Sequence, residues 1–281
     1  MLFLKKSLEV IMGKNKKIWL VTLFCLSFLL IFASGCSQST KKSDDSTKTE
    51  QKQKPKKTKK DQKQPKTLAS ELKNSSKKSL VYSPLGDSLS VGLMVNSQSD
   101  RFTSQFTRQI AKATGKKVEE KGTAMVGKTA TNFGLPNVQT IIDQDPDIVT
   151  VEFGTNDAAD VNNEKALPNY RSSIKQILDQ LQQKTHAKII LMTSWSPADG
   201  PNKENDLRFD KVIKAEGKSR NLPVVNLADI WQGDPSVAGT PASITESVWN
   251  RPADTLHPNQ KGHDKIAKAL TKVLNQPIDN K

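Results

Sequence analysis

Three side chains in this chain have the types and spacing needed for nucleophilic catalysis. Asp254 precedes His257 by three residues, a spacing that lets the carboxylate hold the imidazole Nδ1–H while Nε2 faces outward. Ser88 lies in the sequence Gly86-Asp87-Ser88-Leu89, directly after a short apolar segment. A serine hydroxyl becomes an effective nucleophile when a neighbouring base takes its proton. The three residues therefore predict a Ser-His-Asp triad.

A reaction of this kind also needs hydrogen-bond donors for the negative oxygen of a tetrahedral intermediate. The predicted donors are the backbone N–H groups of Ser88 and Gly127 and the side-chain amide of Asn156. A glycine at position 127 lets a backbone donor approach the substrate with no Cβ in the way. The residues predicted to form turns or to orient these groups are Asp87, Gly154 and Asp157.

Alternating strands and helices are expected to position these groups. Strands are predicted at 80–82, 117–126, 147–153, 188–193 and 224–227, and helices at 102–114, 168–183, 206–215 and 258–274. This alternation predicts a parallel sheet covered by helices on both faces. Ligands bind beyond the carboxyl ends of the strands in such sheets. Ser88, Gly127 and Asn156 follow the first, second and third strands, so one sheet edge can bring them together.

The sequences around Ser88, Gly127, Asn156 and His257 resemble, in order, the four blocks of the SGNH, or GDSL, hydrolase family, which is named for its catalytic Ser, Gly, Asn and His. The resemblance spans roughly residues 79–275. It implies a flavodoxin-like, three-layer α/β/α sandwich with a central parallel sheet. It also implies an esterase, lipase or acylhydrolase that uses no metal or organic cofactor. It assigns the nucleophile to Ser88, the oxyanion donors to Ser88, Gly127 and Asn156, and the remaining triad positions to His257 and Asp254.

The N-terminus has the pattern of an export signal. A lysine cluster at 14–17 precedes an apolar run from Ile18 to Ala33, and Ser34-Gly35-Cys36 follows. Because this ending resembles the bacterial lipobox, residues 1–35 are predicted to be a lipoprotein signal peptide and Cys36 the lipid-attachment site. The alternative is an uncleaved signal anchor with an incidental cysteine. Translation could start at Met1 or at Met12.

Residues 36–78 are predicted to be a disordered tether and residues 79–281 the hydrolase domain. The tether is rich in Lys, Ser, Thr and Gln and has too few apolar side chains to offset its ordering entropy. Residues 1–66 contain sixteen lysines and five acidic residues, so they account for +11 of the net charge of +14. The remaining +3 gives little sign of a nucleic-acid-binding face. The expected protein is a monomer held on the extracellular face of the cell membrane.

The sequence therefore predicts an extracytoplasmic serine esterase. Its expected substrates are acetylated cell-wall or capsular sugars, or lysophospholipids and other lipid esters. One alternative is a lipoprotein that binds a carbohydrate or wall polymer without catalysis on the same scaffold. Another is a solute-binding lipoprotein, although that class normally has two lobes. Residues 231–253 lack periodicity, and long irregular segments are often functional, so Trp231 or Trp249 is predicted to line the substrate pocket.

Overall fold

The structure, a computed structural model, describes residues 65–196, 202–239 and 254–278. These residues all belong to one compact unit, which spans residues 61–281. The predicted signal peptide, Cys36, the tether up to residue 64 and Trp249 lie outside the described residues. Within the described ranges, no helix is long and apolar enough to cross a membrane.

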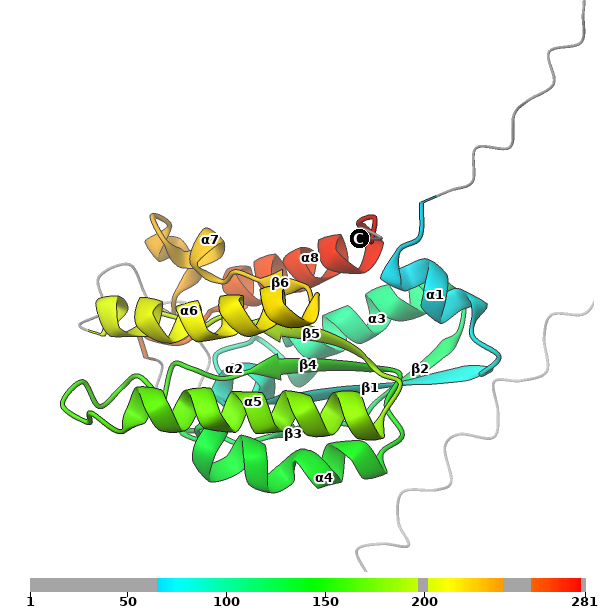
Figure 1. Cartoon of the computed structure of the whole chain (residues 1–281). Coiled ribbons are helices and arrows are strands. Elements are labelled where there is room, and N and C mark those ends of the chain that lie inside the picture. Colours follow the sequence, from blue (N-terminus) through cyan, green and yellow to red (C-terminus); the bar gives the residue numbers. More distant parts are fainter. Residues whose placement is uncertain (1–64, 197–201, 240–253, 279–281) are drawn as a thin grey trace, which may run out of the picture. The chain divides into compact units, whose positions relative to one another are not determined.

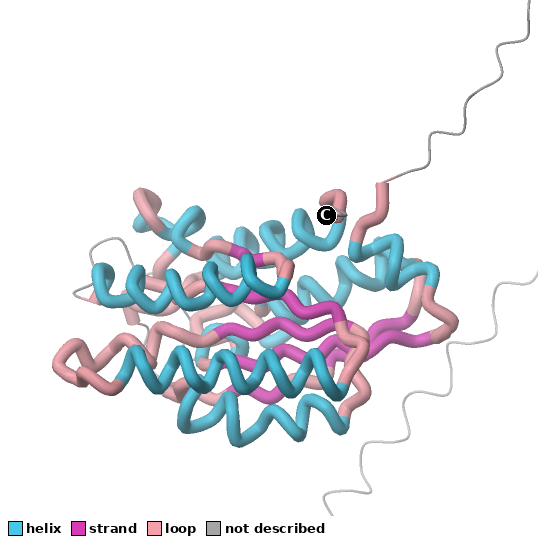
Figure 2. Tube along the Cα trace, in the orientation of Figure 1, coloured by secondary structure: helices cyan, strands magenta, loops and turns pink. Residues whose placement is uncertain are grey.

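A parallel sheet forms the centre of this unit (Figures 1 and 2). Its strand order is β2-β1-β4-β5-β6, and β3 pairs with β1 beyond the end of β2. The strands are β1 (Ser79–Gly86), β2 (Lys117–Glu120), β3 (Thr123–Ala124), β4 (Ile148–Glu152), β5 (Lys188–Met192) and β6 (Val224–Val225). The alternation in the sequence thus predicted the sheet correctly.

The second predicted strand, 117–126, is divided into β2 and β3 in the structure. The break lies beside Pro84 of β1, which has no N–H to donate to a neighbouring strand. Gly122 passes close to this proline, because a Cβ on Gly122 would lie 2.8 Å from Pro84 Cγ. Pairing with β1 resumes at Thr123, opposite Leu85.

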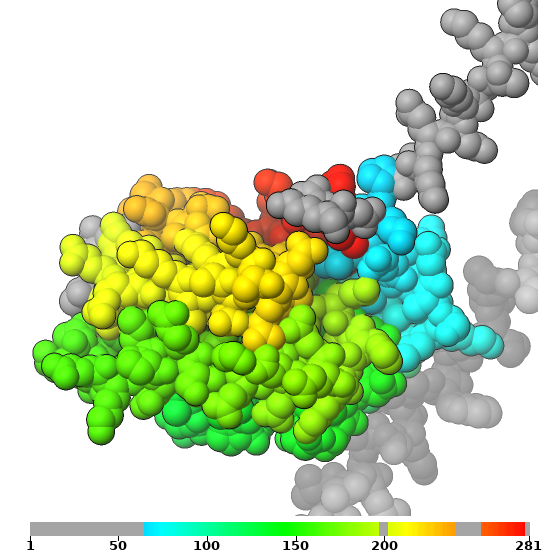
Figure 3. Space-filling model, viewed as in Figure 1, coloured from blue at the N-terminus to red at the C-terminus, as the bar shows by residue number. Residues whose placement is uncertain are grey.

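Helices cover both faces of the sheet, which makes the fold a three-layer α/β/α sandwich, as predicted (Figure 1). One face packs against α1 (Leu68–Asn74), α3 (Phe102–Thr114), α7 (Ala228–Trp231) and α8 (Gln260–Asn275). The other packs against α4 (Leu135–Asp143), α5 (Ala166–Lys184) and α6 (Lys203–Arg220). Figure 3 shows the outer surfaces of α5 and α6, in green and yellow, on the near side. The short helical turns are α2 (Ser88–Val91), η1 (Gln98–Asp100), η2 (Ala130–Gly134) and η3 (Pro235–Val237).

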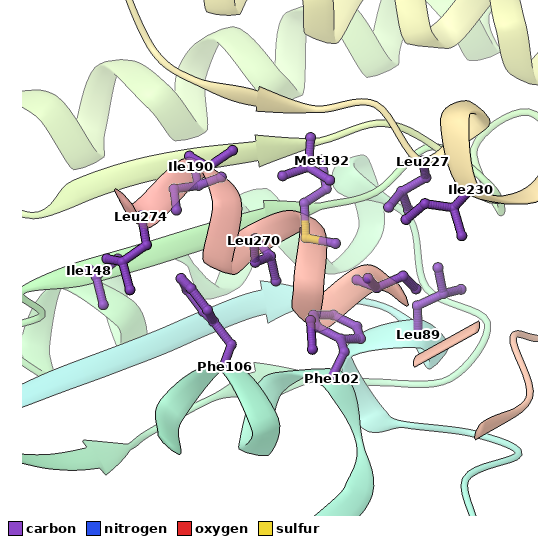
Figure 4. Close-up of a cluster of buried hydrophobic side chains, with 14 of the residues drawn as sticks. Leu89, Phe102, Phe106, Ile148, Ile190, Met192, Leu227, Ile230, Leu270 and Leu274 are labelled. Carbon is purple, nitrogen blue, oxygen red and sulfur yellow. The ribbon is translucent and has the colours of Figure 1, made fainter. Parts of the chain in front are cut away.

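The larger core cluster shows why these elements pack as they do (Figure 4). Phe102, Phe106 and Ile110 recur every four residues along α3 and are completely buried, so they form one apolar face of the helix. Phe106 meets the ring of Tyr82 edge-on at 5.3 Å between centroids. Burying each such side chain contributes about 1.5–3 kcal/mol. This packing fixes β1, and therefore the residues that follow it, against α3.

The domain begins earlier than residue 79, which corrects the predicted boundary. Thr67 and Ser70 cap the start of α1 through reciprocal hydrogen bonds, and Ala69 and Leu72 are buried in the larger core cluster. The ammonium of Lys116 donates to the carbonyl of Leu72 at 2.9 Å. A few apolar side chains within a polar stretch are therefore enough to attach residues 67–78 to the sandwich.

Candidate active site

Ser88 lies at the start of α2, a single helical turn directly after β1. The carboxylate of Asp87 caps this turn, because its Oδ1 accepts the N–H of Leu89 at 3.0 Å. The serine side chain is almost fully buried, and its Oγ lies 2.8 Å from Nε2 of His257. The strand end and the cap together aim the hydroxyl at the imidazole.

His257 belongs to a short loop before α8 that also contains Asp254. Oδ2 of Asp254 lies 2.8 Å from Nδ1 of His257. Oδ1 of Asp254 accepts the backbone N–H groups of Leu256 and His257, at 3.0 and 2.9 Å. Partial burial raises the pKa of Asp254, but the hydrogen bonds from His257 outweigh it and hold this pKa below its usual value. An ionised carboxylate keeps the proton on Nδ1, which leaves Nε2 free to accept the proton of Ser88.

Trp195 holds this loop through a hydrogen bond to Leu256. It was not among the predicted site residues. Its indole N–H donates to the carbonyl of Leu256 at 2.7 Å. Its backbone N–H donates to Oγ1 of Thr155 at 2.8 Å. Trp195, whose indole is completely buried, therefore connects the turn that contains Asn156 to the loop that contains His257. The sequence signal that could have identified Trp195 is its position just after β5, at the sheet edge where the site residues meet.

The predicted oxyanion donors differ in how freely they can bind a ligand. The backbone N–H groups of Ser88 and Gly127 have no hydrogen-bond acceptor among the described residues. Gly127 has a φ of +73°, a conformation that favours glycine. The side-chain amide of Asn156 donates to Oδ2 of Asp87 at 2.9 Å and to the carbonyl of Lys128 at 3.0 Å. Since an amide nitrogen has two hydrogens, Asn156 has to share or exchange one of these bonds to bind an oxyanion.

A buried acid, Glu152, lies directly behind the serine turn and was also missed. Its Oε2 accepts the hydroxyl of Ser90 at 3.0 Å and the N–H of Asp87 at 3.3 Å. Burial, and then the charge of Asp87, raises the pKa of Glu152 well above its usual value, and burial raises that of Asp87 to about 6. A Cβ on Gly86 would collide with Ser90 Oγ and lie 2.8 Å from Glu152 Oε2, so glycine leaves room for this network. The signal was an acid at the end of an otherwise apolar strand.

The other predicted turn residues shape the loops around Asn156. The carbonyl of Gly154 accepts the N–H of Ala158 at 2.8 Å, which closes the turn after β4. Both carboxylate oxygens of Asp157 accept the N–H of Ala130, at 3.0 and 3.2 Å. This carboxylate therefore ties the turn to the start of η2, and burial raises its pKa to about 7.

The assignment of Trp231 to the substrate rim is wrong. Its side chain is 1% exposed and packs in the larger core cluster, and its indole N–H donates to the carbonyl of Ser194 at 3.4 Å. Trp231 belongs to a short helix, α7, which the irregular sequence did not predict. The apolar face of this helix is turned towards the core.

His263 is a second buried histidine, and it has a packing role. Its ring stacks on Phe102 with centroids 5.8 Å apart. Nδ1 accepts the N–H of Phe102 at 3.3 Å, which leaves Nε2 to donate to the carbonyl of Leu93 at 3.0 Å. Burial lowers the pKa of His263 to about 4, so the ring stays neutral. Among the described residues, no group of three or more His, Cys, Asp or Glu side chains could hold a metal ion.

A parallel sheet between two helical layers, with a serine beside a histidine at its carboxyl edge, is an arrangement of α/β serine hydrolases. The model of the GDSL-like Lipase/Acylhydrolase family matches residues 85–265. The chain belongs to this family, and it is a serine hydrolase that acts on ester bonds. A comparison with curated protein sequences gave no match.

Solved structures share the fold at low sequence identity. An acetyl-xylooligosaccharide esterase, Axe2, from Geobacillus Stearmophilus aligns with a TM-score of 0.56 and 17% identity, over 72% of this chain and 97% of its own. A lipase/acylhydrolase from Enterococcus faecalis aligns with a TM-score of 0.52 and 21% identity, over 69% and 94% of the two chains. A two-domain esterase active on acetylated mannans aligns with a TM-score of 0.53 and 20% identity, over 70% and 49%.

Proposed function

We propose that this protein hydrolyses carboxylic esters through a triad of Ser88, His257 and Asp254 and a covalent acyl-enzyme. The observation that carries the proposal is the continuous chain of contacts from Ser88 Oγ to His257 Nε2 and from Nδ1 to Asp254 Oδ2, each 2.8 Å long. Membership of a family of ester hydrolases supports the reaction type.

The geometry allows the following sequence of steps. His257 Nε2 takes the proton of Ser88 as Oγ attacks the ester carbonyl carbon, and Asp254 stabilises the resulting imidazolium. The tetrahedral intermediate collapses, the bond to the alcohol oxygen breaks, and the imidazolium donates its proton to that oxygen. Water then attacks the acyl-enzyme with His257 again as base, which releases the carboxylic acid and restores the Ser88 hydroxyl.

The negative oxygen of the intermediate would be held by Ser88 N–H, Gly127 N–H and the amide of Asn156. The two backbone donors need no rearrangement, because no described residue accepts from them. Asn156 contributes once its bond to the carbonyl of Lys128, which is 3.0 Å long in the structure, is shared or exchanged. Loss of one such donor costs about 10²–10³ in kcat.

The decisive experiment replaces the nucleophile. In Ser88→Ala we expect kcat for p-nitrophenyl acetate to fall by about 10⁴–10⁶, with an unchanged melting temperature. Ser219→Ala, on an exposed serine of α6, is the matched control and should keep full activity. A fluorophosphonate should label the wild type at Ser88, as read by peptide mass spectrometry. Activity retained in Ser88→Ala would exclude the mechanism, and inactivity of the wild type towards all esters would favour a binding protein.

The enzyme would act outside the cytoplasm, held to the membrane by a lipid on Cys36. The support is the basic cluster at 14–17, the apolar run that follows it and the small residues before Cys36. We expect Cys36→Ser to prevent incorporation of labelled palmitate and to move the protein out of the membrane fraction. Cys25→Ser, inside the apolar run, is the control. Equal labelling of both variants would contradict lipid attachment at Cys36.

The sequence leaves two substrate classes open, acylated sugars and lipid esters. Two of the solved structures that share this fold are described as acting on acetylated carbohydrates, and a third is described as a lipase/acylhydrolase. A serine and a histidine can hydrolyse the esters of both classes, so the catalytic residues do not distinguish between them. A choice between them has to come from the surfaces around that site.

A further inference from the structure

A polar pocket adjoins the site on the side of Asn156. Its volume is about 340 Å³, near the lower end of the roughly 300–1,000 Å³ typical of small-molecule sites. One wall comes from the segment around η2 and the other from the loop between β4 and α5 and the first turn of that helix. The hydrogen-bonding side chains along these walls are Thr129, Thr131, Asn132, Asp160, Asn163 and Asn169.

The chemistry of this lining selects among possible ligands. Eight of the nine lining side chains carry a hydroxyl, an amide or a carboxylate, and Ala166 is the single aliphatic one. No lysine or arginine lines the pocket, whereas Asp157 and Asp160 do, so the phosphate of a lipid headgroup would find acidic groups and no cation. An acyl chain would need apolar walls. The large apolar side chains exposed in the described ranges do not line this pocket. They are Met125 and Val126, which precede Gly127, Val161, which follows Asp160, and Leu256, which precedes His257.

Several of the lining groups have free hydrogen-bonding capacity. The side-chain amide of Asn169 has no partner among the described residues and is exposed. Asn132 uses its Oδ1 to accept the N–H of Thr129 at 2.9 Å, which leaves its NH₂ group available. Asp160 accepts the N–H of Asn162 through Oδ1 at 3.3 Å, so Oδ2 is available. A set of separate donors and acceptors that lacks any cation suits the hydroxyl groups of a sugar ring.

Asn156 connects the pocket to the reacting atoms. It lines the pocket, and its amide donates to Asp87, the residue before Ser88, at 2.9 Å. A ligand in the pocket would therefore contact the proposed oxyanion donor, whereas Ser88 and His257 lie outside the pocket lining.

We propose that this pocket binds the sugar that carries the ester, so that the substrate class is an O-acylated neutral carbohydrate. The proposal rests on the serine esterase function above. The pocket holds the alcohol portion of the ester, and the acyl group lies over Ser88, outside the pocket.

The test compares two acetate esters that differ only in the alcohol, O-acetylated xylobiose and p-nitrophenyl acetate. In Asn169→Leu we expect kcat/KM for acetylated xylobiose to fall about tenfold, the size of one lost hydrogen bond, with kcat/KM for p-nitrophenyl acetate within about twofold of the wild type. Gln183→Leu is the matched control, since it makes the same kind of change on an exposed position of α5, fourteen residues and about 21 Å along the helix. It should change neither ester.

The possible outcomes separate this subsite from the esterase function. An equal loss on both esters in Asn169→Leu, or no loss on acetylated xylobiose, would overturn the subsite and leave the esterase intact. Preference of the wild type for lysophosphatidylcholine over acetylated xylobiose would also overturn it. If the wild type hydrolyses no ester, the proposed function fails. Calorimetry with unacetylated xylobiose on wild type and Asn169→Leu then still decides whether the pocket binds a sugar.

Discussion

Asp157 gives the domain a pH dependence of stability that can be worked out from the structure. Its carboxylate is 7% exposed, and burial raises its pKa from 3.8 to about 7. A raised acid pKa means that the unfolded chain loses its proton first as the pH rises. The stability associated with the neutral carboxyl is therefore fully present below about pH 4 and is lost as the pH rises through about 7.

The size of the effect follows from linkage, in which one pKa unit is about 1.4 kcal/mol. With these two pKa values, ionisation of Asp157 lowers the free energy of unfolding by about 2 kcal/mol at pH 5 and about 4 kcal/mol at pH 7. Asp157→Asn keeps an oxygen that can accept the N–H of Ala130 and removes the titration. The stability of this variant relative to the wild type should therefore rise by about 2 kcal/mol between pH 5 and pH 7.

Urea denaturation at several pH values measures this difference, and the change corresponds to about 4–8 °C in melting temperature for a domain of this size. Other buried acids also titrate, including Asp87 with a pKa of about 6 and Asp206 with a pKa of about 7, but they are common to both proteins. Asp143→Asn, on an exposed carboxylate, should leave the wild-type profile in place. A constant difference between Asp157→Asn and wild type from pH 5 to pH 7 would refute the reasoning.

Two further predictions concern the histidine. Asp254→Asn should lower kcat for p-nitrophenyl acetate by about 10⁴, because an amide can stabilise the wrong tautomer of His257; Asp229→Asn is the control, and a loss below tenfold would show that Asp254 does not orient the ring. Trp195→Phe removes the 2.7 Å bond to the carbonyl of Leu256 and should lower kcat by about tenfold with KM unchanged, because it loosens the His257 loop. Trp231→Phe, in the core, should lower the melting temperature and leave kcat unchanged. If Trp195→Phe instead lowered the melting temperature and left kcat unchanged, Trp195 would have no role in positioning the His257 loop.

The layers of the fold could be predicted because each rests on a local pattern. Phe102, Phe106 and Ile110 lie one helical turn apart, and the run from Ile148 to Phe153 is apolar enough for a central strand. Since parallel strands end at a common edge, the residues after them could be expected to meet. The hydrogen bond between Asn156 and Asp87, which are 69 residues apart, follows from this rule and not from their distance along the sequence.

What could not be predicted depends on packing between distant residues. The sequence around Trp231 does not show whether this tryptophan is buried in the core or lines a pocket. In either case it would be an aromatic residue in a segment without periodicity. The break between β2 and β3 depends on Pro84 in the neighbouring strand. The role of Glu152 behind Ser90 and Asp87 becomes visible only when β4 pairs with β1.

The position of α1 has a consequence for the direction in which the enzyme faces. Glu71 of this helix pairs with Lys188, the first residue of β5, at 2.6 Å, so the chain enters the domain at the amino ends of the strands. Ser88, the proposed nucleophile, follows the carboxyl end of β1, and a five-residue strand is about 17 Å long. An N-terminal anchor, as proposed above, would therefore join the domain at the sheet edge opposite Ser88, and the chain that enters there would not lie across the catalytic edge.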